Sequence, residues 1–418
     1  MAPTTDIRLT CHCHSTSSIY QFPSSALPLH SFFTISPIHT ALIGSPLLLL
    51  AHIPSTLTHS VTTTSIETSE DSNIGRSGKI ALDGSGLLTP SDDEEKPWCE
   101  SFFCKTCGGT LYLRQGNANS STPHEALLCV GSTDLTANDK DSPSVSFENL
   151  YKVQGHIGLQ GSHFKCFSDV IIDGLPRYPD GGPAGILWAA PVARRREDQE
   201  KGEELHGACA CGGVSFRIRH PNTVPEDDAT TRGWIKPTTK GQRLCATVCF
   251  CNTCREVSGA LGWVWMFTPR PILDISYAAM DGAGTSGKGG EAGNAHGMYH
   301  SSAQKDDPEL TRHWCRRCGC SVFYQAPSGN GGNEMWDVAV GCLSANVGKQ
   351  RRGWREWVIT KFGEGEGESK NRNVWDQRRV DVYIGQWLDG EMSYECDGLD
   401  FWAPFVSMVR NGVREVGW

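Results

Sequence analysis

The sequence lacks an excess of positive charge and lacks any long hydrophobic run. Its 38 lysines and arginines are outnumbered by 47 aspartates and glutamates, which gives a formal net charge of −9 at pH 7. Bulk attraction to a phosphate backbone therefore does not drive binding, and nucleic acid is not an expected partner. The most apolar run, residues 41–53, contains a proline and a histidine. It is too short to span a bilayer, so we expect a buried strand or an irregular segment there and no membrane association.

A basic segment followed by an apolar core is also missing from the first 20 residues, which are mostly polar. This absence argues against a secretory signal. We therefore expect the cysteines to be reduced and the protein to be soluble and cytoplasmic, with the nucleus as the alternative. The length of 418 residues favours two domains, and the 46 glycines favour a loop-rich, mainly β protein.

What the sequence does contain is 18 cysteines, most of them closely spaced. C-x-C and C-x-x-C pairs are typical of zinc sites, whereas a secreted disulfide scaffold would need an oxidising compartment. We therefore predict that the paired cysteines bind Zn²⁺. These candidate metal ligands are Cys11, Cys13, Cys104, Cys107, Cys209, Cys211, Cys249, Cys251, Cys254, Cys315 and Cys318.

The densest group is the C-x-C-x-x-C triad of Cys249, Cys251 and Cys254. Two sulfurs on one tetrahedral zinc lie about 3.8 Å apart, whereas residues i and i+2 of a strand lie about 6.6 Å apart. The chain must therefore turn here, and Asn252 and Thr253 favour a turn. Three protein ligands leave the fourth position of the metal open, as in catalytic zinc sites. The alternatives are a disulfide pair or separate core thiols.

The remaining paired cysteines predict two closed sites. Since the triad is contiguous, Cys209 and Cys211 are left to share a metal with Cys315 and Cys318. The first half offers an equivalent set, namely Cys11, Cys13, Cys104 and Cys107. Four-cysteine sites are structural, because they join distant strands and contribute folding free energy.

The spacing of these motifs indicates a tandem repeat of about 200 residues. The interval from C-x-C to C-x-x-C is 104 − 11 = 93 residues in the first copy and 315 − 209 = 106 in the second, and a Gly-rich insertion at 281–297 accounts for the difference. We predict a degenerate domain over 1–190, a charged linker over 191–205 and a complete domain over 206–418.

The first copy has no counterpart of the triad, because residues 14–98 contain no cysteine. Three histidines lie in this interval, His39, His52 and His59, and we expect them on the surface or in loops. Several other residues border the motifs and are alternative ligands: His14, Cys99, Cys245 and Cys320. The isolated cysteines are expected to be small buried apolar residues: Cys129, Cys166, Cys342 and Cys396.

At these motifs the second copy resembles the glutathione-dependent formaldehyde-activating enzyme family, which includes the centromere protein V type. The family pattern is G-x-C-x-C-G, then C-x-C-x-x-C-R, then C-x-x-C-G. It matches Gly207–Gly212, Cys249–Arg255 and Cys315–Gly319. The resemblance covers roughly 205–345, and residues 7–175 match only at the first and last motifs. Tandem copies of this unit are familiar in fungal proteins of the family.

The resemblance implies two tandem Mss4-like zinc-binding β domains and a reaction class. The reaction is carbon–sulfur bond making and breaking, with glutathione and formaldehyde giving S-hydroxymethylglutathione. It implies a catalytic zinc on Cys249, Cys251 and Cys254 and a small-molecule thiol such as glutathione as partner. Arg255 could hold a carboxylate of that thiol, or could be a solvated arginine. Trp263 and Trp265 could line the pocket, or belong to the core.

Two functions are therefore expected to compete. The first is a zinc-dependent carbon–sulfur lyase that resembles S-(hydroxymethyl)glutathione synthase. The second is a non-catalytic zinc-binding interaction module of the centromere protein V type. Neither the oligomeric state nor the exact substrate follows from the sequence.

Overall fold

The computed structural model describes about half of the chain, in segments from both halves, and leaves the last 58 residues outside. The described residues are 3–34, 36–46, 48–53, 63–64, 73–82, 88–90, 98–116, 125–134, 147–157, 176–178, 204–223, 235–238, 241–249, 252–279, 295–301, 310–325, 335–344 and 358–360. Most of the predicted linker, the Gly-rich insertion and His59, Cys166 and Cys396 lie outside them.

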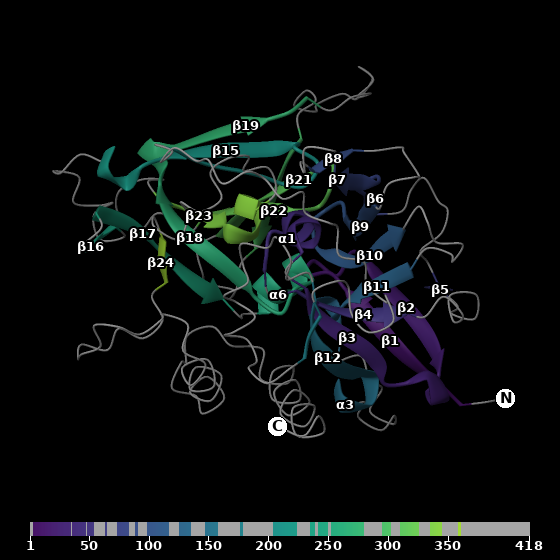
Figure 1. The fold of residues 1–418 in the computed structure, drawn as a ribbon. Helices are drawn as coiled ribbons and strands as arrows, with labels where there is room; N and C mark the ends of the chain where they lie inside the picture. The colour runs from purple at the N-terminus through teal and green to yellow at the C-terminus, as the bar shows by residue number, and fades with distance from the viewer. Residues whose placement is uncertain are drawn as a thin grey trace, which may run out of the picture.

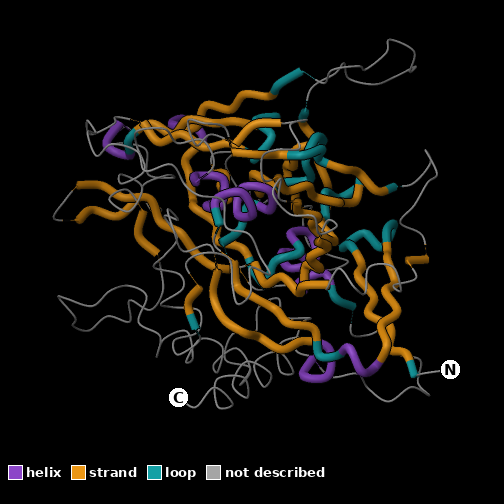
Figure 2. Tube along the Cα trace, turned by 45° about the vertical axis from the view of Figure 1, so that its right-hand side comes forward, coloured by secondary structure: helices purple, strands orange, loops and turns teal. Residues whose placement is uncertain are grey.

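Strands dominate the described residues, as Figure 2 shows, so the predicted mainly β class is confirmed. Each half begins with a small antiparallel sheet that carries a C-x-C motif at its first turn. In the first half this sheet contains β1 (Thr4–Thr10), β2 (Ser17–Pro23) and β5 (Thr63–Thr64). In the second half it contains β14 (Glu204–Ala208), β15 (Val214–Arg219) and β19 (Leu273–Tyr277).

Each half also has a larger sheet, and the C-x-x-C motif lies at one of its turns. In the larger sheet of the first half the strand order is β13-β12-β3-β4-β11-β10-β9-β7-β8, and β6 also pairs with β9. Its strands are β3 (Leu29–Thr34), β4 (Leu48–Ile53), β6 (Ile74–Arg76), β7 (Ile80–Leu82), β8 (Leu88–Pro90), β9 (Trp98–Cys104), β10 (Thr110–Gly116), β11 (Glu125–Cys129), β12 (Tyr151–Ile157) and β13 (Arg177–Tyr178).

The larger sheet of the second half has the order β16-β17-β18-β23-β22-β21-β20, with β24 on β17. Its strands are β16 (Ile235–Thr238), β17 (Gly241–Cys249), β18 (Trp263–Pro269), β20 (His296–Ser301), β21 (Leu310–Cys315), β22 (Ser321–Gln325), β23 (Met335–Ala339) and β24 (Val358–Thr360). The hairpins β9–β10 and β21–β22 correspond, since each places a C-x-x-C-G turn between antiparallel strands.

A short helix occupies the same place in each half. Helix α1 (Pro37–Ile43) connects β3 to β4, and α6 (Asn252–Ser258) connects β17 to β18. Both helices end at a glycine in the left-handed region, Gly44 with φ 87° and Gly259 with φ 73°. Glycine adopts this conformation without the steric cost of a Cβ atom and so terminates helices.

The expectation for residues 41–53 was therefore only partly right. The strand is present as β4, but the first residues of the run belong to α1. The sequence carries the signals for this helix, with Pro37 at its first turn and Gly44 just beyond its end. Apolar composition alone did not distinguish a short helix from a strand.

Each of these two helices packs against the opposite half of the chain. Helix α1 of the first half packs on the 3₁₀ turn η6 (Val340–Ser344) of the second half, and α6 of the second half packs on η2 (Val130–Ser132) of the first. Equivalent backbone hydrogen bonds join them at 3.1 Å, from Gly341 N to Gly44 O and from Gly131 N to Gly259 O. In Figure 1, α1 and α6 lie near the middle, between the purple-to-blue strands and the teal-to-green strands.

The hydrophobic core crosses the boundary between the halves as well. One buried cluster runs from Phe32, Leu42 and Leu50 in the first half to Val257 and Phe323 in the second. This continuity implies that the described parts of the two halves stabilise each other. Within the described residues, no helix is long and apolar enough to cross a membrane.

Candidate metal centres and active site

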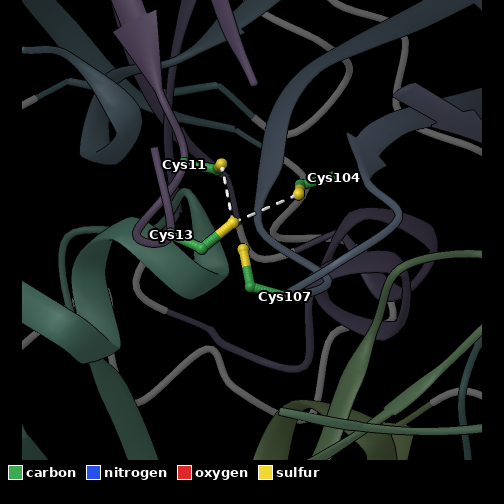
Figure 3. A group of neighbouring side chains, drawn as sticks. All are labelled: Cys11, Cys13, Cys104 and Cys107. Carbon is green, nitrogen blue, oxygen red and sulfur yellow. Dashed lines mark hydrogen bonds between the residues drawn. The ribbon is translucent and has the colours of Figure 1, made fainter. Parts of the chain in front are cut away.

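The four cysteines predicted to form the first closed site converge (Figure 3). Cys11 and Cys13 follow β1, and Cys104 and Cys107 bracket the turn between β9 and β10. The Sγ atom of Cys13 lies 3.5 Å from that of Cys11 and 3.6 Å from that of Cys104. All four sulfurs lie within 4.8 Å of one another, close to the spacing of about 3.8 Å that a tetrahedral zinc needs.

The second closed site forms in the same way at the corresponding turns. Cys211 Sγ lies 3.6 Å from Cys209 Sγ and 3.5 Å from Cys315 Sγ, and Cys318 completes the group. All four residues are buried, and the described cysteines form no disulfide. Both groups could hold a metal ion, and their ligand type and spacing are compatible with zinc.

Backbone amides support the sulfurs of both groups. Thr106 N donates to Cys104 Sγ at 3.3 Å, and Val214 N donates to Cys209 Sγ at 3.3 Å. Such N–H donors favour the negatively charged thiolate, which is the form that binds metal. The two C-x-C turns also share a backbone shape, because His14 with φ 55° occupies the place of Gly212 with φ 69°. His14 thus adopts the left-handed backbone conformation that this turn requires. The group of sulfurs beside it already contains four cysteines without His14.

The electrostatics of the clusters fit a bound cation. Hydrogen bonds from Cys107, Cys11 and Cys13 hold the pKa of Cys104 far below its usual value. The same hydrogen bond between Cys104 and Cys107 raises the pKa of Cys107. In the second group, bonds from Cys209, Cys315 and Cys318 hold the pKa of Cys211 far below its usual value. Four sulfurs this close cannot all be thiolates without a compensating charge, and a divalent metal ion supplies it.

The described cysteines that were predicted as alternative ligands, Cys99 and Cys320, are not members of these groups. Cys99 and Cys129 are buried in β9 and β11, where burial raises the pKa of both thiols. Cys320 and Cys342 are also fully buried, with their sulfurs 3.5 Å apart. Buried packing was the prediction for Cys129 and Cys342, and it is confirmed. The side chain of Cys245 lies outside the described part.

The predicted catalytic triad falls at the junction of β17 and α6. Cys249 is the last residue of β17, Cys251 lies outside the described residues, and Cys254 is in the first turn of α6. The first and third cysteines therefore do not lie in one extended strand, in which they could not share a metal. Convergence of the three sulfurs stays a prediction, because only the Cys254 side chain is described.

Cys254 is buried beside a positive charge. Its Sγ atom accepts a hydrogen bond from Arg312 Nη2 at 3.7 Å, and Arg312 is only 1% exposed. The guanidinium also lies 4.8 Å from the ring centroid of Tyr324, a favourable cation–π contact. A fixed positive charge beside a sulfur favours the thiolate. Cys254 thus has the surroundings of a metal ligand or a reactive thiol, separate from both four-cysteine clusters.

A half-buried carboxyl group, that of Asp337, lies in the field of the same arginine. Burial raises the pKa of Asp337 to about 8, although the Arg312 charge acts in the opposite direction. Asp337 is on β23, paired in register with Tyr324. At neutral pH this carboxyl therefore retains its proton for most of the time, so it can act as a proton donor.

Arg255, predicted to bind a substrate carboxylate, directs its described hydrogen bonds to the protein itself. Its guanidinium is buried and donates to the carbonyl oxygens of Gly131 and Thr133 in the first half. It also forms an ion pair of 2.9 Å with Glu256. These contacts give Arg255 a role in fixing α6.

The tryptophans that could line a pocket are core residues. Trp263 is 0% and Trp265 is 2% exposed, and their rings stack with centroids 4.5 Å apart. Trp263 Nε1 donates to Gly44 O at 3.0 Å, across the boundary between the halves. Trp265 lies 5.8 Å from Tyr324, measured between ring centroids, and so borders the group around Arg312.

The first half does have a structural counterpart of the triad segment, which the absence of cysteine concealed. Counting back from the glycine that ends each helix, Thr34, Ser36 and His39 stand where Cys249, Cys251 and Cys254 stand in the second half. Thr34 Oγ1 and His39 Nδ1 are hydrogen bonded at 3.0 Å.

Contrary to the expectation of surface or loop positions, His39 and His52 are buried. Burial lowers the pKa of His39 to about 4, so its imidazole is neutral at pH 7. A neutral, hydrogen-bonded group fills the place of the thiols, and the first half has one four-cysteine cluster and no second set of sulfurs at α1.

The residues that sequence reasoning missed are Arg312, Tyr324 and Asp337. They come from β21, β22 and β23, which follow or precede the C-x-x-C turn in ways that no spacing rule reveals. Three adjacent strands bring them together, and the only signal in the sequence was a charged residue within β21 and within β23.

Comparisons with known proteins add no evidence about these residues. A scan against models of protein families found no match, and a search of curated proteins found no relative.

The clusters predict a metal-dependent fold. Cys318→Ser should remove one zinc per chain and lower the melting temperature by at least about 10 °C, because structural zinc binding contributes directly to folding. The matched control is Cys342→Ser, which alters an equally buried cysteine outside both clusters. Metal analysis and thermal unfolding of both variants check this, and equal zinc content in the two would contradict it.

The half-buried carboxyl of Asp337 predicts a pH-dependent stability. Because the pKa of Asp337 is raised from 3.8 to about 8, the folded state holds a proton that the unfolded state releases. Its contribution to stability is complete below about pH 4 and is lost as the pH rises to about 8. Asp337→Asn should remove this pH dependence. The melting temperature of the variant should therefore rise relative to that of the wild type between pH 6 and pH 8. A constant difference would show that Asp337 titrates normally.

Proposed function

We propose that this protein is a zinc-dependent carbon–sulfur lyase that acts on the adduct of an aldehyde with glutathione or a similar thiol. The observation that carries the proposal is Cys254. It is a buried cysteine outside both four-cysteine clusters, it lies 3.7 Å from the Arg312 guanidinium, and it is carried by α6, the helix that comes after the strand ending at Cys249. The family resemblance of the three motifs supports the same reaction class.

The three cysteines at this junction are of the residue type and spacing that a metal ion with three thiolate ligands needs. Cys249, Cys251 and Cys254 would hold the zinc, which when bound would offer a coordination position to the thiolate of the substrate. Zinc with three thiolates has a net charge of about −1. The buried positive charge of Arg312 balances it, and this stabilises a charged site inside the protein.

The chain's own residues account for the movement of the proton. In the synthetic direction a sulfur–carbon bond forms between the thiol and the carbonyl carbon, the thiol loses its proton, and the carbonyl oxygen gains one. In the lyase direction the same bond breaks, the hydroxyl oxygen loses its proton and the sulfur gains one. A carboxyl with a pKa of about 8 exchanges protons readily near neutral pH. In this proposal Asp337 is that group, and Arg312 orients the sulfur.

The second candidate is a non-catalytic interaction module of the centromere protein V type. It is favoured by the two closed clusters, since closed sites stabilise a fold without chemistry. The net charge of −9 argues against direct binding to DNA, so such a module would bind protein. The two candidates differ in what they require of Cys254, which only the enzyme needs as a ligand of a metal with an open coordination position.

The enzyme hypothesis predicts that Cys254→Ser abolishes catalysis and leaves the fold intact. The wild type should bind three zinc ions and accelerate the exchange between formaldehyde, glutathione and their adduct, which NMR exchange spectroscopy measures. The variant should bind two zinc ions, melt within a few degrees of the wild type and show only the uncatalysed exchange.

Cys342→Ser is the control, because it removes a buried thiol from the same half without touching the triad. Two zinc ions in the wild type, together with exchange no faster than in buffer, would favour the interaction module instead.

A further inference from the structure

Helix α6, which carries Cys254, is attached to the opposite half of the chain. The amide of Gly131 in the first half donates to the carbonyl of Gly259 at the end of α6. In return, Arg255 in the helix donates to the carbonyls of Gly131 and Thr133. Both are buried contacts that fix the helix to η2.

The first metal cluster contacts the same helix. His12, between the ligands Cys11 and Cys13, is hydrogen bonded through Nδ1 to Glu256 Oε2 at 3.2 Å. A Cβ atom built on Gly109 would meet both the Glu256 carbonyl oxygen at 3.0 Å and Cys107 Sγ at 3.3 Å. The backbone of α6 is therefore within direct contact of the turn that holds the first cluster, and its ribbon passes beside Cys13 in Figure 3.

The reciprocal contact exists at the other helix. Ala210, between the second cluster's ligands Cys209 and Cys211, donates its amide hydrogen to Ala41 O of α1 at 3.1 Å. Each cluster thus holds the helix of the other half. The first half lacks a cysteine triad but still contacts the helix that carries Cys254.

We propose that the first half is a positioning platform for the site around Cys254. Its metal cluster holds α6 through His12, and its η2 turn holds α6 through Gly131 and Arg255. Together they set where Cys254 lies relative to Arg312. Loss of the first cluster should therefore loosen a helix that belongs to the second half. Only the consequence for a metal at Cys254 rests on the proposed function, since the docking of α6 is independent of it.

A pair of equivalent glycines provides the test. A methyl group at Gly131 would overlap the carbonyls of Gly259 and Ala260, and one at Gly341 would overlap Gly44 in the same way. Gly131→Ala thus acts as a steric wedge that pushes the end of α6 away from the first half. Gly341→Ala is the matched wedge variant, which pushes the end of α1 away from the second half. Hydrogen exchange of the full-length protein, followed by mass spectrometry, reports on each helix separately.

Gly131→Ala should speed exchange in α6 at least about tenfold and leave α1 near its wild-type rate. Gly341→Ala should do the reverse. Equal acceleration of both helices by either wedge, or unchanged exchange of α6 in Gly131→Ala, would overturn the proposal.

A milder change guards against misfolding of the wedge variants. Glu256→Gln weakens the contacts to His12 and Arg255 and keeps the shape of the side chain. Its control, Asp274→Asn, removes an exposed ion pair with Arg217 of 3.3 Å. Glu256→Gln should speed exchange in α6 and the control should not, whereas identical α6 exchange in the two variants would overturn the proposal.

Cadmium-113 NMR of the metal-substituted protein separates this proposal from the proposed function. If Cys254 binds metal, a third resonance is present, and it should shift in Glu256→Gln while that of the second cluster stays in place. If only two resonances are present, the proposed function fails, and the exchange rates of α6 still decide whether the first half positions the helix. A third resonance that is the same in Glu256→Gln and in the wild type would count against positioning.

Discussion

The mutual repulsion of closely packed sulfur atoms is the constraint on which this structure depends. Each cluster brings four cysteines from turns about a hundred residues apart to within 4.8 Å. One thiol of each group, Cys104 or Cys211, is held as a thiolate by hydrogen bonds from its neighbours. A cation at the centre of such a group would balance the negative charge of several thiolates and would link metal binding to folding. The C-x-C turns, and the two helices that contact them, would then be stabilised by the metal as well.

The two halves share one architecture at this junction but carry different side chains there. Both have a strand, a short helix and a left-handed glycine at the junction where the second half has its triad. In the second half the helix carries Cys254 beside a buried arginine, whereas in the first half it carries a neutral His39 bonded to Thr34. The architecture is preserved because each helix is part of the interface with the other half.

Motif spacing predicted the two closed clusters and the repeat, because ligand geometry constrains both directly. Cysteine patterns could not reveal α1, since its place in the repeat is marked by Pro37 and Gly44 and by no thiol. Arg255 was predicted to face substrate because it follows the triad, but burial under η2 is a property of the tertiary fold. Arg312 and Asp337 come from strands that are adjacent only in the sheet, and local sequence carries no record of that neighbourhood.

The packing of each helix against the opposite half has a consequence for the origin of the asymmetry. Gly131 with Gly259 and Gly341 with Gly44 are the same contact made twice, as across the two-fold axis of an isologous dimer. A protein with one such unit would associate with a copy of itself, and any substitution would alter both sites at once. Covalent fusion of the two units removes that restriction, so one half can lack the cysteine triad while it continues to contact the helix that carries Cys254 in the other half.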